Sequence, residues 1–178
     1  RNRVAALDTT AGLATVWDTN SDNSVLGLAK YGSNVYAVGL FTSIGGETRN
    51  RVAALDASTG LATSWNPNSN WTVNAVALNS NGSIAYVGGL FTSINGQTRS
   101  RLAAIDTATG LPTSWNPNSN GVLKSILLNG STLYVGGDFT SIGAQSRNRI
   151  AALDASTGLA TSWNPNANNS VRSLAILG

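Results

Sequence analysis

Four tryptophans recur at nearly constant spacing, and this repeat constrains the fold more than any other feature of the sequence. Intervals of 48, 50 and 48 residues separate Trp17, Trp65, Trp115 and Trp163. The same intervals separate Asp8, Asp56, Asp106 and Asp154. A fixed period of this length indicates tandem structural units that bury a core by stacking on their neighbours.

Each unit contains short strand-like segments separated by turn-forming residues. In the unit that spans residues 73–120, the segments are Val73–Leu78, Ile84–Phe91, Arg101–Ile105 and Leu111–Trp115. Asn-Gly pairs and an Asp-Thr-Ala-Thr-Gly stretch lie between them and favour turns. Every segment is too short for a helix and rich in residues that favour strands, so the unit is predicted to hold four strands.

Some of these strands are apolar on both faces. Successive side chains of a strand point to opposite faces, and Val52–Leu55 has four apolar residues in a row. Such a strand must be covered on both sides, which sheets packed side by side around an axis achieve. We therefore predict an all-β chain, a β-propeller of four-stranded antiparallel blades. A parallel β-helix, the main alternative, has shorter coils and fewer hairpins.

The repeat divides the chain into about 3.75 blades. The predicted boundaries are a partial blade at 1–22, blades at 23–70, 71–120 and 121–168, and a partial blade at 169–178. In the partial units, Arg1–Leu7 and Val171–Leu177 are expected to form strands, and no counterpart of Ser131–Phe139 is present. Because a sheet without an interior strand exposes unpaired backbone groups, we expect further blades of the same chain or a neighbouring chain to complete the propeller.

Three motifs of the fourth unit resemble a known repeat. They are Tyr134–Gly143 (YVGGDFTSIG), Arg147–Asp154 (RNRIAALD) and Thr157–Pro165 (TGLATSWNP). Together they resemble the bacterial delta-60 repeat, a β-propeller repeat of unassigned function, and every complete unit of the chain carries them. The resemblance implies a propeller within a large secreted or cell-surface bacterial protein, and it implies no enzymatic activity.

A weaker likeness concerns the segment from Ala54 to Trp65. It is similar to the tryptophan-docking motif of quinoprotein-type propellers, although the spacing from Gly60 to Trp65 is one residue longer here. That motif is structural, so the likeness implies no quinone cofactor.

The repeated residues are interpreted as structural. The tryptophans are expected to be buried between blades, and the aspartates to cap turns that end in glycine. The arginines Arg3, Arg51, Arg101 and Arg149 could pair with these aspartates, while Arg49 and its equivalents could contact backbone carbonyls at the blade edge. The functional alternatives are a row of sugar-stacking platforms for the tryptophans and an anion-binding ring for the arginines.

The amino-acid composition excludes many kinds of catalytic site. The chain contains no Cys, Met or His, so thiolate nucleophiles, the commonest metal ligand and the usual neutral-pH base are all missing. Outside the repeated position the acids are Asp18, Asp22, Glu47 and Asp138, which form no recognisable catalytic pair. We predict no catalytic, metal or cofactor site, and no enzymatic activity.

Charge and hydropathy exclude two classes of partner. The 11 basic and 8 acidic residues give a formal net charge of +3, and most of the basic residues stand at one repeated place instead of in a cluster. This pattern argues against nucleic-acid binding. No apolar run approaches the roughly 20 residues that a membrane-spanning helix needs, so membrane insertion is not expected.

Positions that differ between units are the better candidates for binding. The second residue of each unit's first strand differs between the units. It is Leu26, Asn74, Lys124 and Arg172 in turn, and these residues share no chemistry. Trp71 and Tyr31 are the aromatic residues outside the repeat pattern. The candidate contact residues are therefore Trp71, Tyr31, Asn74, Lys124 and Arg172, with Trp71 as the strongest.

Two hypotheses of function follow. The first is a non-catalytic structural, binding or adhesion module of a secreted or cell-surface bacterial protein, with a protein or a surface glycan as partner. The second is a fragment of a carbohydrate-active enzyme whose catalytic acids lie in other blades. A pocket lined by non-repeated acids would favour the second hypothesis.

Overall fold

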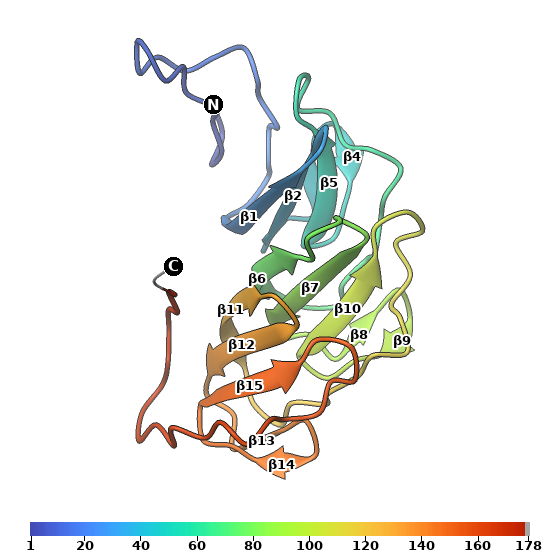
Figure 1. The fold of residues 1–178 in the computed structure, drawn as a ribbon. Helices are drawn as coiled ribbons and strands as arrows, with labels where there is room; N and C mark the ends of the chain where they lie inside the picture. The colour runs from blue at the N-terminus through green and yellow to red at the C-terminus, as the bar shows by residue number, and fades with distance from the viewer. Residues whose placement is uncertain (177–178) are drawn as a thin grey trace.

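The computed structural model describes residues 1–176, which form an open arc of three antiparallel sheets (Figure 1). The first sheet contains β1 (Val25–Tyr31), β2 (Asn34–Gly39) and β5 (Val52–Asp56). The second contains β6 (Val73–Leu78), β7 (Ile84–Gly89) and β10 (Leu102–Asp106), and the third β11 (Leu123–Asn129), β12 (Thr132–Gly137) and β15 (Ile150–Asp154). The predicted all-β fold with repeating antiparallel blades is confirmed. Within residues 1–176 we find no helix of the length and apolarity needed to span a membrane.

Each blade has a short hairpin between its second and third strands, and each strand of the hairpin has two residues. These hairpins pair β3 (Ser43–Ile44) with β4 (Glu47–Thr48), β8 (Ser93–Ile94) with β9 (Gln97–Thr98), and β13 (Ser141–Ile142) with β14 (Gln145–Ser146). The sequence indicated a turn here, at Asn95 and Gly96, and the structure adds the short strands that flank it.

The fourth segment of each blade pairs with the third strand through a single bridge. Leu55 bridges Ala62, Ile105 bridges Pro112, and Leu153 bridges Ala160. In the first blade the ladder ends after the bond from Thr63 N–H to the Ala54 carbonyl, because the Thr63 hydroxyl accepts the next available N–H, that of Trp65. A side chain that captures backbone N–H groups in this way competes with sheet pairing.

The two terminal units pair less than the sequence suggested. Arg1–Leu7 contributes one bridge, from Leu7 to Ala14, and residues 171–176 form no strand. Leu177, the last residue of the expected C-terminal strand, lies outside the described residues. A strand depends on a neighbour for its backbone hydrogen bonds, and residues 171–176, which run along the open side of the arc (Figure 1), have one to the third blade, from the Val171 N–H to the Gly137 carbonyl.

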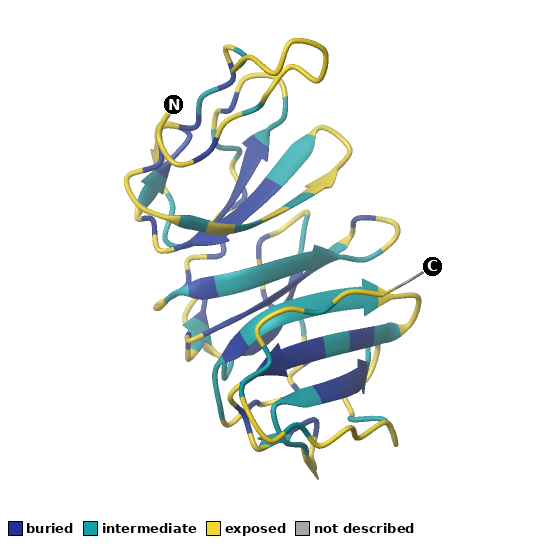
Figure 2. Cartoon of the chain, turned by 90° about the vertical axis from the view of Figure 1, so that its left-hand side faces the viewer, coloured by how far each residue is buried: buried dark blue, intermediate teal, exposed yellow. Residues whose placement is uncertain are grey.

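The core lies between neighbouring sheets. Alternate residues of β5 contribute to different clusters: Ala53 and Leu55 pack in the cluster that contains Trp17, whereas Val52 and Ala54 pack in the cluster that contains Trp65. The same division recurs at the next sheet, where Ala103 and Ile105 of β10 pack in the cluster of Trp65, whereas Leu102 and Ala104 pack in the cluster of Trp115. Burial is therefore concentrated in the second and third strands of each blade, whereas the first strands are less buried (Figure 2), as two-sided apolar strands require.

Three repeated tryptophans join consecutive units. Trp17, Trp65 and Trp115 are no more than 7% exposed. Their indole N–H groups donate to the backbone carbonyls of Asp56, Asp106 and Asp154 in the following unit, over 3.1, 3.0 and 3.4 Å. Each tryptophan thus supplies a large apolar surface and a satisfied polar group to the same junction.

The repeated aspartates cap turns, as the sequence suggested. Oδ1 of Asp56 accepts the N–H groups of Ser58 and Thr59 and the hydroxyl groups of the same two residues. These bonds, above all the one from the Ser58 hydroxyl, lower the pKa of Asp56 to about 2. The Ser156 hydroxyl is the main cause of a similar fall, to about 2, in the pKa of Asp154.

The repeated arginines bind carbonyl groups instead of the aspartates. Arg51 adopts a left-handed backbone with φ of 63°, and its guanidinium donates to the carbonyl of Ser69 over 3.2 Å. Arg49 donates to the carbonyl of Thr63 over 2.6 Å. The ion pair considered between Arg51 and Asp56 is not formed, because the turn groups already satisfy the Asp56 carboxylate.

We predict that Trp65→Ala destabilises the chain by about 3 to 5 kcal/mol, the usual range for truncating a buried large aromatic. Leu61→Ala, in the same segment but 59% exposed, should cost less than about 0.5 kcal/mol. Urea unfolding of both variants measures the difference. A cost below about 1 kcal/mol for Trp65→Ala would contradict the assignment of this side chain to the core.

We predict that the folded chain loses stability in acid because of the Asp56 and Asp154 carboxyl groups. Both carboxyls have a pKa near 2 in the folded chain, below the value of about 3.9 for unfolded Asp. The unfolded chain therefore binds protons first, and stability falls as the pH drops from about 4 to 2. Asn keeps the oxygen acceptor without the titration, so Asp56→Asn/Asp154→Asn should flatten melting temperature against pH in this window. An unchanged acid slope would refute the prediction.

The hairpin turns give a matched test of backbone strain. Ala144 has a φ of 61° at a turn position where the first blade has Gly46, with a φ of 82°. Left-handed backbone costs an L-residue about 1–2 kcal/mol, and the extra freedom of glycine in the unfolded chain offsets part of this. Ala144→Gly should therefore stabilise the chain by about 0.5–1 kcal/mol, and Gly46→Ala should destabilise it similarly. Equal signs in the two unfolding experiments would contradict the explanation.

Candidate functional site

The first strands of the three blades begin at the same rim of the arc (Figure 1), and this rim is the end of the blades meant below. These strands contact each other, β1 with β6 and β6 with β11, so they form the inner side. The residue that follows each second strand lies beside this end, because Leu40, Leu90 and Asp138 donate their N–H groups to the residues just before β1, β6 and β11. Side chains that differ between units therefore gather here on a repeated backbone.

Trp71 lies at this end and points into solvent. Its side chain is 58% exposed. A cavity of about 290 Å³ beside it is also lined by Leu90 and Val122, together with Asn70, Thr92 and Arg101. We call the apolar part, Trp71, Leu90 and Val122, the Trp71 surface.

The backbone under Trp71 belongs to the repeat, whereas its side chain does not. The buried hydroxyl of Ser69 donates to the Trp71 carbonyl over 2.7 Å. Equivalent bonds run from Ser21 to Asn23 and from Ser119 to Gly121. The same scaffold therefore presents Asn, Trp or Gly at this position, so the indole is not needed to build the blade.

The polar groups of the Trp71 cavity are already bonded within the chain. Asn70 donates to the Thr92 hydroxyl and accepts the N–H groups of Thr92 and Ser93. Arg101 donates to the Ser119 carbonyl over 3.2 Å. The cavity thus offers mainly apolar contact to a ligand.

An ion pair stands at the same end of the third blade. Lys124 Nζ lies 2.9 and 2.7 Å from the two carboxylate oxygens of Asp138 and also donates to the Ser170 hydroxyl. Asp138 occupies the position held by Leu40 and Leu90 in the other blades. The hydrogen bond from Lys124 is the main cause of the lowered pKa of Asp138, to which the charge of exposed Arg172 also contributes.

The remaining predicted contact residues do not join this site. Asn74 donates its side-chain N–H to the Leu123 carbonyl over 2.7 Å and so links two blades. Tyr31 ends β1, at the far end from Val25, and packs on the turn at Gly82, where a Cβ would lie 2.0 Å from the Tyr31 ring. Asn74 and Tyr31 therefore contribute to blade-to-blade packing, and their contact with a partner stays a prediction.

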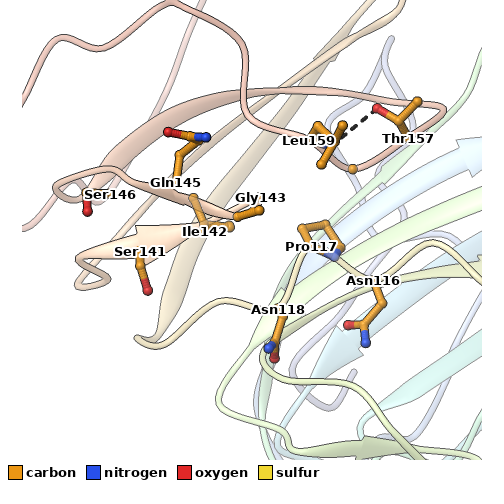
Figure 3. Close-up of a pocket in the computed structure, with 12 residues that line it drawn as sticks. Asn116, Pro117, Asn118, Ser141, Ile142, Gly143, Gln145, Ser146, Thr157 and Leu159 are labelled. Carbon is orange, nitrogen blue, oxygen red and sulfur yellow. Dashed lines mark hydrogen bonds between the residues drawn. The ribbon is translucent and has the colours of Figure 1, made fainter.

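A larger polar cavity, which the sequence did not indicate, lies near the β13–β14 hairpin (Figure 3). It has a volume of about 440 Å³ and is lined by Asn116–Asn118, residues 141–146 and the turn at 157–159. None of these side chains is ionisable. Most of them stand at repeated positions, so nothing in the sequence separates them from the scaffold.

Neither cavity can perform acid–base chemistry with its own side chains. No carboxylate lines the Trp71 cavity or the cavity at β13–β14. In the part of the chain that the structure describes, no group of three or more His, Cys, Asp or Glu side chains is placed to hold a metal ion. What the site offers is an exposed aromatic ring on a rigid base.

Comparison with solved structures supports the fold. The computationally designed Ika4 protein is similar over 88% of this chain and 82% of its own, with 15% sequence identity and a TM-score of 0.56. At this identity the likeness shows a shared fold and nothing of function. No curated protein matches the chain.

A family model matches the chain in two places. The matched segments are residues 79–103 and 131–156, which run from the second to the third strand of the second and third blades. The family is described as a β-propeller domain of unknown function (DUF5122). This match confirms the sequence resemblance to a propeller repeat of unassigned function.

Proposed function

We propose that this propeller is a non-catalytic binding module of a secreted or cell-surface bacterial protein, and that the Trp71 surface contacts a partner protein. The observation that carries the proposal is the 58% exposed Trp71 indole on a backbone that the repeat holds in place. Tryptophan is enriched among the residues that dominate the energy of protein interfaces.

The neighbours of Trp71 favour a protein over a glycan. Leu90 and Val122 extend the apolar area, and Leu40 occupies the matching position of the first blade and is 38% exposed. A sugar would need hydrogen-bonding partners for its hydroxyl groups, whereas Asn70 and Arg101 are bonded within the chain. An apolar centre bordered by the Lys124–Asp138 pair fits the anatomy of a protein interface.

The alternative of a carbohydrate-active enzyme has less support. General-acid catalysis by a carboxyl group uses a raised pKa, but the bond from Lys124 lowers the pKa of Asp138, the non-repeated acid of the third blade. The cavity walls described above also lack carboxylates.

A secreted or surface location is proposed from composition and resemblance. The chain has no cysteine or methionine to oxidise. The delta-60 resemblance points to large secreted or surface-displayed bacterial proteins.

Selection of a phage-displayed peptide library on the chain tests the proposed surface. We expect peptides enriched on the unmodified chain to lose at least tenfold in affinity for Trp71→Ala, about 1.4 kcal/mol, and to bind Leu61→Ala unchanged. Both side chains are largely exposed, so both variants should melt close to the unmodified chain.

Two outcomes would overturn the assignment. If the selected peptides bind Trp71→Ala as tightly as the unmodified chain, the contact surface lies elsewhere. If a glycan array instead shows sugars that bind the unmodified chain and lose binding with Trp71→Ala, the partner is a glycan and the choice of protein is wrong.

A further inference from the structure

Three carboxamide side chains line the cavity near the β13–β14 hairpin (Figure 3), and we call them the amide cluster. They are Asn116 and Asn118, in the segment that follows Trp115, and Gln145 in β14. All three residues are exposed, and their side chains form no hydrogen bond to other groups within residues 1–176. Because a carboxamide has two N–H donors and a carbonyl acceptor, the amide cluster has hydrogen-bonding capacity that the described chain does not use.

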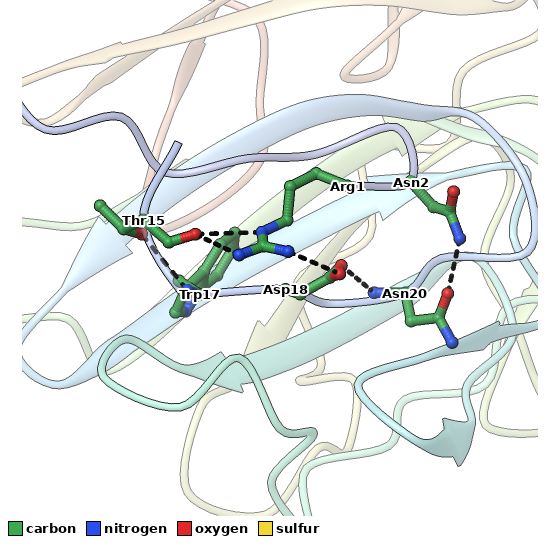
Figure 4. A network of polar contacts seen from close by, with 6 residues as sticks. All are labelled: Arg1, Asn2, Thr15, Trp17, Asp18 and Asn20. Carbon is green, nitrogen blue, oxygen red and sulfur yellow. Dashed lines mark hydrogen bonds and ion pairs between the residues drawn. The ribbon is translucent and has the colours of Figure 1, made fainter. Parts of the chain in front are cut away.

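A single difference between the units leaves Asn118 free. Each of its counterparts accepts an amide N–H from an asparagine 18 residues earlier in the sequence. These pairs are Asn2–Asn20 (Figure 4), Asn50–Asn68 and Asn148–Asn166. In the unit of Asn118 the earlier position is Ser100, whose side chain is too short to make this bond.

The backbone around Ser100 is nevertheless that of the other units. The Ser119 N–H donates to the Ser100 carbonyl, as the Ser69 N–H does to the Asn50 carbonyl, over 3.2 Å in both cases. The replacement of asparagine by Ser100 therefore frees one carboxamide and leaves the local fold as it is.

Gln145 also lacks a contact that its counterpart makes. In the second blade, Gln97 accepts a hydrogen bond from Arg99 over 3.2 Å. Arg147, the counterpart of Arg99, makes no such bond to Gln145 within residues 1–176. The first blade has the charged Glu47 at this position. The third blade thus combines a neutral side chain with a free amide.

The cavity is not open merely because the described chain stops nearby. Trp163, which no unit follows within residues 1–176, is 42% exposed, although the sequence predicted a buried tryptophan, whereas Trp115 is 6% exposed. The amide cluster behaves differently, because its counterparts in the second blade are exposed although a third blade follows. These counterparts are Asn66, Asn68 and Gln97. A following blade therefore does not cover this side of the hairpin.

The cavity suits a neutral ligand that carries several hydroxyl groups. None of its side chains is ionisable, so a charged ligand would lose hydration without gaining an opposite charge. A hydroxyl group both donates and accepts hydrogen bonds, as each carboxamide does. Leu159, which is 56% exposed, adds an apolar wall for the C–H groups of a sugar ring. The volume of about 440 Å³ lies within the roughly 300–1,000 Å³ of small-molecule sites.

A peptide strand is disfavoured at this hairpin, because the outer backbone groups are already bonded. The Ser141 carbonyl accepts the Asn120 N–H, and the Ser141 N–H donates to the Asn120 side chain. On the other strand, the Ser146 carbonyl accepts a hydrogen bond from Arg147 over 2.8 Å. A peptide that extends a sheet needs free backbone groups at the edge. The free groups here belong to side chains.

We propose that the amide cluster is a binding site for a neutral saccharide. The carboxamides of Asn118 and Gln145 bond to hydroxyl groups of the sugar, and the C–H groups of its ring lie against Leu159. This cavity shares no lining residue with the Trp71 cavity. The saccharide site is therefore a second binding site, separate from the proposed protein contact.

NMR titration of the 178-residue chain with neutral sugars tests the proposal. The probes are methyl glucoside, methyl galactoside, maltose and lactose, and glucuronic acid is the charged control. We expect a neutral sugar to shift the side-chain N–H signals of Asn118 and Gln145, and glucuronic acid to shift neither. Asn68 and Gln97 are internal controls whose signals should stay in place, because they are exposed but bonded within the chain.

Two variants remove the amides one at a time. Asn118 has a φ of 56°, which glycine adopts without strain, so Asn118→Gly is the suitable change at this position. Asn118→Gly and Gln145→Ala should each weaken sugar binding at least tenfold, about 1.4 kcal/mol. Thermal melting checks that both variants stay folded.

Ser100→Asn gives a test from outside the cavity, since residue 100 does not line it. The introduced asparagine should donate to Asn118 as Asn50 does to Asn68. It should therefore weaken sugar binding while the melting temperature stays the same or increases. Asn50→Ser, the reverse change in the preceding unit, is the matched control and should leave sugar binding unchanged, as should Trp71→Ala.

Four results would overturn the proposal. One is that no neutral sugar shifts the signals of the amide cluster, and another is that a sugar binds Asn118→Gly and Gln145→Ala as tightly as the unmodified chain. A third is unchanged sugar binding in Ser100→Asn although the Asn118 amide signal has moved. The fourth is loss of sugar binding with Trp71→Ala, which would place the sugar at the Trp71 surface.

Discussion

The junction between a tryptophan of one unit and an aspartate turn of the next holds the arc together. A single blade has two apolar faces and cannot fold in isolation without exposing one of them. The indole covers that face and donates to a carbonyl that the turn positions, as between Trp65 and Asp106. The carboxylate, the turn and the indole thus depend on one another, which explains why Trp and Asp recur with the same period.

The need to cover both faces of each blade also divides the positions of the repeat into those that build the scaffold and those that form the surface. Ser69, Arg51 and Asp56 satisfy backbone groups inside the repeat, and all three lie at positions that recur. With the backbone fixed by these bonds, a position such as 71 can change freely without loss of fold. Binding surfaces of repeat proteins arise from such variable positions on a constant frame.

Much of this architecture could be predicted from the sequence, because the strands follow local patterns. Val73–Leu78 coincides with β6, and the turns at Asn95 and Asp106 lie where their residue types indicated. The fourth strand was predicted, but its reduction to a single bridge could not be, since that depends on a hydroxyl that captures a backbone N–H. The role of Asn74 was also hidden, because its acceptor, the Leu123 carbonyl, is 49 residues away in sequence.

Hydrogen exchange of the five indole N–H groups, followed by NMR, tests the central role of the tryptophan junction most directly. The account predicts slow exchange for Trp17, Trp65 and Trp115, whose indoles are buried and bonded, and fast exchange for Trp71. Exchange of Trp65 as fast as that of Trp71 would contradict the account.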